Sequence, residues 1–139
     1  MKKEILRQEN WIWVAFIAAL LAMAGSLQAS NVWGWVPCEL CWYQRILMYP
    51  LVLILFIAGV KQDKAVAQYV LPMSLIGMSI GIYHYLLQLG VVVPSGTCGV
   101  EAVSCAILDH MWLGFITLPL LSAFAFLVVA VAMWRLRVK

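Results

Sequence analysis

The chain has 139 residues, of which 65% are hydrophobic and 11% are charged. A soluble domain of this size needs far more polar surface, so the composition excludes an ordinary soluble globular protein. The net charge of +3 comes from basic residues that flank apolar runs, as membrane topology signals do, and it calls for no nucleic-acid partner.

Four apolar runs follow one another along the chain, each close to the 20 residues that a helix needs to cross a bilayer. They occupy approximately residues 11–30, 40–60, 69–93 and 112–134. Almost nothing remains for a soluble domain, so residues 1–139 are predicted to form a single all-α membrane domain, a bundle of four transmembrane helices. A signal peptide is the alternative for the first run, but the apolar stretch is too long and residues 27–29 make a poor cleavage site.

The lysines and arginines predict the orientation of this bundle. All but one of the nine lie before the first run, between the second and third, or after the fourth. An even number of spans puts these three segments on one side, and the positive-inside rule makes that side cytoplasmic. Both termini are therefore predicted to be cytoplasmic, and the other two connecting segments to be extracytoplasmic. Arg45 alone breaks the pattern.

All four cysteines lie in the two segments that are predicted to face outward. Cys38 and Cys41 form a Cys-x-x-Cys motif, and six residues separate Cys98 from Cys105. Closing loops this short stabilises a protein by only about 2.5 kcal/mol or less, which adds little to four spanning helices. Both pairs are therefore better suited to thiol–disulfide exchange than to structural stapling. A four-cysteine zinc site is the other interpretation, and the longer spacing of the second pair disfavours it.

Cys41 and Arg45 stand one helical turn apart near the start of the second run. If that helix begins near Leu40, Cys41 lies in its first turn, where free amide groups and the helix dipole favour a thiolate. Arg45 then adds a fixed positive charge beneath the sulfur. Snorkelling of Arg45 to the interface is the simple alternative, whereas an anionic or electron-accepting group nearby would explain both its position and its charge.

His84 lies within the third run, an estimated one to three turns below the outer surface when counted back from Pro94. One interpretation is a structural histidine that hydrogen-bonds to another helix. The other is a functional histidine that donates a hydrogen bond or relays a proton beside a bound carbonyl compound. Other polar side chains can supplement such a site, but the sequence does not fix the helix faces on which they lie. They are Tyr43, Tyr49, Tyr83, Tyr85 and Gln88.

The segment PCELCWYQR at residues 37–45 resembles the signature of the DsbB/BdbC family of membrane disulfide bond formation proteins. In that family a proline-preceded Cys-x-x-Cys opens the second helix, and an arginine follows the second cysteine by four residues. The resemblance covers nearly the whole chain and looks closest to the short-loop BdbC-type members. The best-studied type has a long second outer loop, whereas only six residues separate Cys98 from Cys105 here.

The resemblance implies a quinone-dependent protein-disulfide oxidoreductase in the bacterial cell membrane. A thioredoxin-like thiol oxidase of the DsbA/BdbD kind, outside the membrane, would deliver two electrons to a Cys98–Cys105 disulfide. By position, Cys98 would be the cysteine attacked by that partner, and Cys105 would be its mate. The product would be an oxidised partner that forms disulfide bonds in exported proteins.

The resemblance also implies where the electrons leave the protein. They would pass to a Cys38–Cys41 disulfide, and Cys41 would then reduce a membrane quinone, either menaquinone or ubiquinone. Arg45 would lie near the quinone oxygen. His84 matches the histidine of the family's third helix by position.

Two other classes of protein fit parts of the pattern. A vitamin K epoxide reductase-like quinone reductase shares the bundle and the paired cysteines, but its active Cys-x-x-Cys lies on the last helix. A small disulfide-stabilised transporter or structural subunit is the second alternative. Proton-coupled transport usually needs an acidic residue within the membrane, and all six acidic residues here lie in tails, loops or helix edges.

Overall fold

The computed structural model describes residues 2–93 and 116–138 of the chain. The elements are α1 (Lys2–Asn31), α2 (Glu39–Lys61), the short 3-10 helix η1 (Lys64–Val66), α3 (Ala67–Gln88) and α4 (Leu118–Val138). The four α-helices are all long and apolar enough to cross a membrane. The predicted class, an all-α membrane protein with four long helices, is therefore confirmed.

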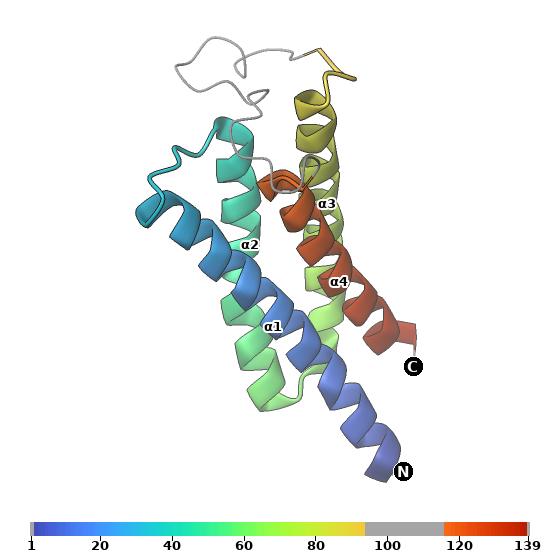
Figure 1. The fold of residues 1–139 in the computed structure, drawn as a ribbon. Coiled ribbons are helices and arrows are strands. Elements are labelled where there is room, and N and C mark those ends of the chain that lie inside the picture. Colours follow the sequence, from blue (N-terminus) through green and yellow to red (C-terminus); the bar gives the residue numbers. More distant parts are fainter. Residues whose placement is uncertain (1, 94–115, 139) are drawn as a thin grey trace.

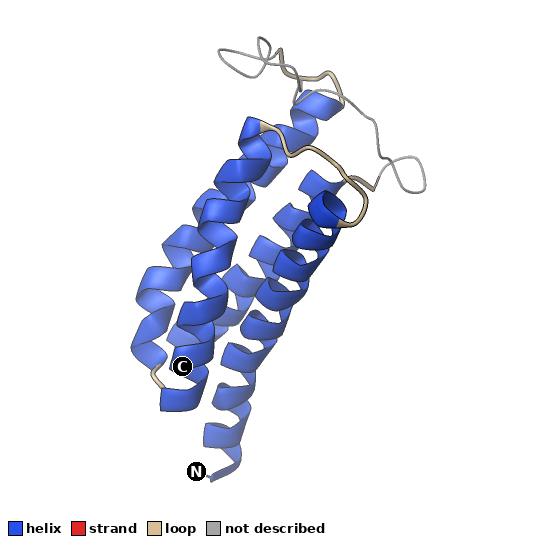
Figure 2. Cartoon of the chain, turned by 90° about the vertical axis from the view of Figure 1, so that its left-hand side faces the viewer, coloured by secondary structure: helices blue, strands red, loops and turns tan. Residues whose placement is uncertain are grey.

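The helices form a bundle in which each packs against its neighbours in the chain, and α4 returns to pack against α1 (Figure 1). Figures 1 and 2 show the N-terminus, the C-terminus and the turn between α2 and α3 at one end of the bundle. The connection from α1 to α2, the end of α3 and the start of α4 lie at the opposite end. The Cys-x-x-Cys motif therefore lies at the end of the bundle away from both termini.

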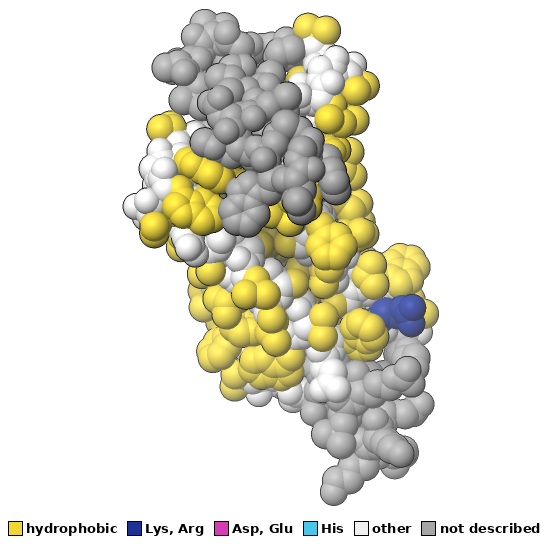
Figure 3. All heavy atoms as spheres, in the orientation of Figure 1, with side chains coloured by type: hydrophobic (Ala, Val, Ile, Leu, Met, Phe, Trp, Pro, Cys, Tyr) yellow, Lys and Arg dark blue, Asp and Glu magenta, His cyan; other side chains and the backbone are white. Residues whose placement is uncertain are grey.

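The outer surface of the bundle is apolar, as a lipid-facing surface must be. Hydrophobic side chains cover most of the described face in Figure 3, and Lys and Arg side chains appear there only near the end that carries the termini. Large apolar side chains such as Leu21, Leu53, Ile76 and Phe124 are more than half exposed. Because lipid is as apolar as these side chains, the helices must be held together by close packing rather than by burial from water.

The closest packing in the bundle lies between α3 and α4, where glycines let the helices approach. A Cβ atom at Gly77 would overlap the ring of Phe126, which is fully buried. A Cβ atom at Gly81 would lie 2.9 Å from the Cβ of Ala123 and 3.1 Å from its Cα. Small residues at such crossings allow the backbones to approach closely, and they fix the face that α3 turns toward α4.

Gly81→Ala is expected to destabilise the bundle by about 1–3 kcal/mol, because the new methyl group meets helix backbone that cannot move aside. The free energy of unfolding in detergent, followed by circular dichroism, measures the effect. Gly25→Ala is the matched control, since nothing lies within 4 Å of a Cβ atom there. Equal stability of the two variants would contradict this account of the α3–α4 contact.

The end of α3 differs from the expected limit of the third apolar run near residue 93. The helix ends at Gln88, and Gly90 follows in the left-handed region with φ of +71°. The amide of Gly90 donates to the carbonyl of Leu87, and the amide of Val91 donates to that of Leu86. These two bonds form a Schellman motif, which satisfies the last carbonyls and stops the helix although the sequence remains apolar.

The helix α4 begins at Leu118, after the expected start of the fourth run near residue 112. Residues 112–115 lie outside the described residues, whereas Ile116 and Thr117 precede the helix in a non-helical conformation. Pro119 is the second residue of α4, where the missing amide leaves no hydrogen bond unmade.

Candidate thiol redox site

The Cys-x-x-Cys motif forms the start of α2. Cys38 is the N-cap residue in an extended conformation, and Cys41 is the third residue of the helix. The carbonyl of Cys38 accepts the first helical bond from the amide of Trp42 at 3.1 Å. This turn brings the two sulfurs to 3.2 Å, with the Cys38 thiol donating to Cys41 Sγ. Cys38 is only 7% exposed, whereas Cys41 is half-buried.

The Cys38 thiol is held in its protonated form. The hydrogen bond to Cys41, followed by burial, raises the pKa of Cys38 from 9.0 to about 12, and the contact with His84 acts in the opposite direction. A thiol that donates a hydrogen bond and lies out of water keeps its proton. The negative charge of the reduced pair is therefore expected on Cys41, at the helix start that favours an anion.

Alkylation of the reduced protein by iodoacetamide at pH 8 is expected to modify Cys41 well before Cys38. The pKa of about 12 lowers the thiolate population of Cys38 on the order of a thousandfold relative to a thiol of pKa 9.0. The ratio of the Cys41 rate to the Cys38 rate should fall as the pH rises toward 12, because Cys38 then loses its proton. Peptide mapping after short pulses measures both rates, and denatured protein provides the control. Faster modification of Cys38 at pH 8 would contradict this assignment of the proton.

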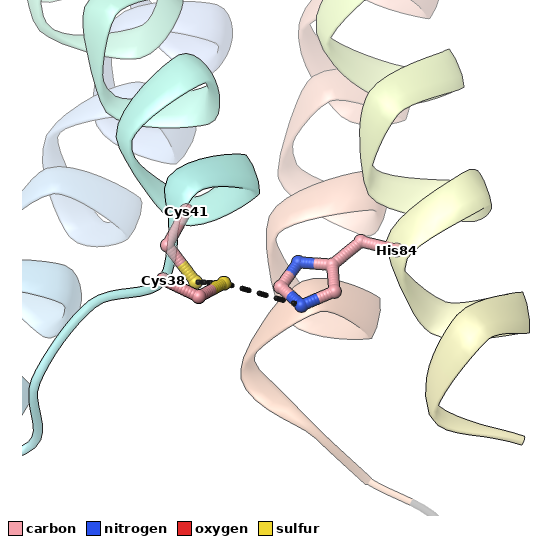
Figure 4. Close-up of side chains that lie close together, drawn as sticks. All are labelled: Cys38, Cys41 and His84. Carbon is pink, nitrogen blue, oxygen red and sulfur yellow. Dashed lines mark hydrogen bonds between the residues drawn. The ribbon is translucent and has the colours of Figure 1, made fainter. Parts of the chain in front are cut away.

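His84 projects from α3 toward the cysteine pair across the gap between α2 and α3 (Figure 4). It is 1% exposed, and its Nε2 lies 3.5 Å from Cys38 Sγ. Gln44, also buried, places its amide nitrogen 3.3 Å from His84 Nδ1. When that amide donates to Nδ1, the ring proton resides on Nε2 and faces the Cys38 sulfur. His84 can then hold or move a proton at Cys38.

Arg45 lies one turn deeper in α2 than Cys41, as expected, and its side chain is bound to α1. Its Nε donates to Ser26 Oγ at 2.8 Å, and one terminal nitrogen donates to the Ser26 carbonyl at 2.9 Å and to the Ser30 hydroxyl. The guanidinium also lies 5.5 Å from the centre of the Trp42 ring. Hydrogen bonds to two serines of α1 therefore fix the position of this positive charge, which simple snorkelling to the interface does not explain.

A cavity of about 730 Å³ joins these groups, because Cys38, Cys41, Arg45 and His84 all line it. Its volume lies within the usual range for a small-molecule site. Among the described residues, three buried polar atoms have no hydrogen-bond partner, and the residues that carry them all line this cavity. They are Tyr49 Oη, Gln88 Oε1 and Thr117 Oγ1. The remaining lining is mainly apolar, so the cavity suits an apolar molecule that carries a few hydrogen-bonding groups.

The structure thus brings together four of the residues that the sequence indicates, Cys38, Cys41, Arg45 and His84. The other predicted pair, Cys98 and Cys105, lies outside the described residues, and so does its expected disulfide.

Sequence reasoning missed several polar residues of the site. Gln44, Ser26 and Ser30 contact the predicted residues. Their signal was present, because each is a polar residue inside an apolar run, and the two serines stand four residues apart on one face of a helix. Thr117 was missed as well, although it too is a polar residue inside an apolar run.

Comparisons with known proteins agree on one family. The family model described as "Disulfide bond formation protein DsbB" matches residues 8–136. Disulfide bond formation protein C of Bacillus subtilis (strain 168) is 47% identical over 131 residues, which cover 91% of this chain and 92% of that protein. A probable disulfide formation protein of Oceanobacillus iheyensis is 44% identical over 132 residues, which cover 94% of this chain and 91% of that protein. A probable disulfide formation protein of Coxiella burnetii is 38% identical over 120 residues, which cover 86% of this chain and 82% of that protein. No solved structure matches the chain significantly.

Proposed function

The chain belongs to the DsbB family of disulfide bond formation proteins, and on that premise we propose that it transfers electrons from a thioredoxin-like thiol oxidase to a membrane quinone. Family membership itself implies a bacterial membrane protein with oxidoreductase activity. The finer proposal is a relay in which Cys98–Cys105 receives electrons from the extracytoplasmic partner and Cys38–Cys41 delivers them to the quinone.

One observation carries this proposal: the dithiol of Cys38 and Cys41 lines the same cavity as Arg45 and His84. A thiol pair that served only as a structural clip would have no need of a lined cavity or of a fixed cation beside it. The cavity is lined mainly by apolar residues of the helices that are long and apolar enough to cross a membrane. The arrangement therefore favours a lipid-soluble electron acceptor over a soluble one.

The lining of the cavity fits a quinone. The apolar side chains suit its ring and tail, and the unpartnered hydroxyls of Tyr49 and Thr117 are donors that suit carbonyl oxygens. A quinone supplies the two-electron acceptor chemistry, so that the net reaction converts a partner dithiol and a quinone into a partner disulfide and a quinol.

The residues of the chain then have separate tasks. The first turn of α2 holds Cys41 as a thiolate, which is the nucleophilic form of a cysteine. Arg45, positioned by Ser26 and Ser30, stabilises negative charge that develops on an acceptor oxygen in the cavity. His84 holds or moves the proton at Cys38 Sγ as the pair alternates between dithiol and disulfide.

Steady-state turnover tests the proposal. Purified protein is mixed anaerobically with a reduced thioredoxin-like partner and either a menaquinone or a ubiquinone analogue. We expect equal losses of quinone and of partner dithiol, and the losses should stop in Cys98→Ser. Protein whose thiols are alkylated beforehand is the matched control. No turnover with either quinone, or full turnover in Cys98→Ser, would refute the relay.

We also propose that both termini are cytoplasmic and that the cysteine end of the bundle faces outward. A membrane-impermeant maleimide applied to intact cells should label Cys98 after reduction. Val138→Cys in a background without other cysteines is the control for the opposite end, and it should react only after the cells are permeabilised. The reverse pattern would overturn the orientation.

A further inference from the structure

The dithiol of Cys38 and Cys41 and the ring of His84 form a compact cluster of metal-ligating groups. Sγ of Cys38, Sγ of Cys41 and a ring nitrogen of His84 all lie within 4.8 Å of one another. We propose that the reduced site binds one thiophilic d10 metal ion, such as Zn²⁺, through these three atoms. This site is distinct from the four-cysteine site that the spacing of the second pair disfavours, and it needs neither Cys98 nor Cys105.

The distances between these atoms suit a tetrahedral ion. Bonds of about 2.3 Å to sulfur and 2.0–2.1 Å to nitrogen separate two sulfur ligands by about 3.8 Å, and a sulfur from a nitrogen by about 3.6 Å. The observed separations are 3.2 Å between the sulfurs and 3.5 Å between Cys38 Sγ and His84 Nε2. The third separation, between Cys41 Sγ and the His84 nitrogen, is at most 4.8 Å. A shift of up to about 1 Å at the more exposed Cys41 therefore creates the site, and all three ligands line the cavity, which leaves room for a fourth ligand.

Gln44 is placed to support the histidine ligand. A metal on Nε2 leaves the ring proton on Nδ1, where it needs an acceptor. The side-chain amide of Gln44 lies 3.3 Å from Nδ1. Since an amide carries a donor and an acceptor, a flip of Gln44 presents its oxygen to that proton. The same residue can thus serve the tautomer that faces Cys38 and the tautomer that binds metal.

The charge balance also favours the ion over a bare dithiolate. Cys41 already carries the negative charge of the reduced pair, so only the S–H bond of Cys38 breaks. Two metal–sulfur bonds form and one proton is released, with no change in oxidation state. A divalent cation and two thiolates sum to zero, so the buried site gains no net charge. The disulfide form offers no thiolate and therefore no site. Metal binding is consequently restricted to the reduced protein, where it occupies both sulfurs and stops electron transfer.

A direct binding experiment needs neither partner nor quinone, so its outcome is independent of the proposed relay. Purified Cys98→Ser/Cys105→Ser protein is reduced, freed of reductant anaerobically and titrated with Zn²⁺ against a chromophoric chelator. We expect one ion per chain, about one proton released per ion, and no binding after the remaining pair is oxidised. Cd²⁺ should produce a thiolate charge-transfer band in the ultraviolet with the same stoichiometry.

The contribution of His84 distinguishes a built site from the metal affinity of any dithiol. His84→Ala is expected to weaken Zn²⁺ binding by about 100-fold or more, since loss of a mere supporting residue already costs 10–100-fold. His110→Ala, which changes the other histidine of the chain, is the matched control and should bind as the parent protein does. Equal affinity in the two variants would overturn the proposal, and so would binding that persists in the oxidised protein.

Discussion

Cys41→Ser is expected to lower quinone turnover by on the order of 10⁴-fold or more, the scale on which an enzyme loses rate with its nucleophile. A serine hydroxyl has nearly the same size but neither ionises at neutral pH nor forms a disulfide. The substitution should leave the start of α2 intact, because Cys38 makes the first helical bond through its carbonyl and not through the side chain at position 41. Initial rates of quinone loss with a reduced partner measure the effect.

Cys38→Ser is the matched comparison for this variant. It should also abolish turnover, because no disulfide can form, but Cys41 should still react rapidly with iodoacetamide since its helix-start environment is unchanged. A Cys41→Ser protein that retains a tenth of the parental rate would show that another group passes the electrons on.

Arg45→Met is expected to reduce kcat/KM for the quinone by about 10²–10³-fold, the usual cost of removing one preorganised charge stabiliser. Methionine keeps an unbranched apolar stem but removes the guanidinium that α1 holds beside the cavity. The exchange between the partner and the cysteine pairs should continue, because it develops no negative charge on a quinone oxygen. Quinone kinetics, together with single-turnover oxidation of the partner, separate the two steps.

Ser26→Ala/Ser30→Ala gives a graded version of the same test. The positive charge remains, but it loses two of its hydrogen-bond acceptors, so we expect a smaller effect of about tenfold, mainly on KM. Ser79→Ala is the matched control, since that hydroxyl bonds only to the carbonyl of Leu75 in its own helix. If the Arg45→Met protein kept the parental kcat/KM for the quinone, Arg45 would have no role in quinone reduction.

The apolar runs and the Cys-x-x-Cys motif were sufficient to predict the class of fold, because a bilayer leaves an apolar chain few structures other than spanning helices. The first turn of α2 was also predictable, since Pro37 and the motif mark its start. The end of α3 was not predicted, although Gly90 was a visible stop signal, because the apolar run continued past it.

The contacts within the site could not be predicted, because they depend on how each helix is rotated about its axis. His84 meets Cys38 only when α3 turns Gly77 and Gly81 toward α4, a choice made by packing rather than by the hydrophobic pattern. Arg45 was expected to serve the sulfur above it, whereas its hydrogen bonds lie on α1. Such pairings join residues far apart in the chain, and a single sequence carries no trace of them.

The central claim is that the pair Cys38–Cys41 passes its electrons directly to an acceptor in the adjoining cavity. The most direct test of this claim uses the Cys98→Ser/Cys105→Ser protein. It is reduced, freed of reductant and mixed anaerobically with one equivalent of a quinone. Alkylation followed by mass spectrometry counts the remaining thiols while absorbance follows the quinone. We expect both thiols and one quinone to disappear together at the same rate. Thiols that persist beside unreacted quinone would contradict the account.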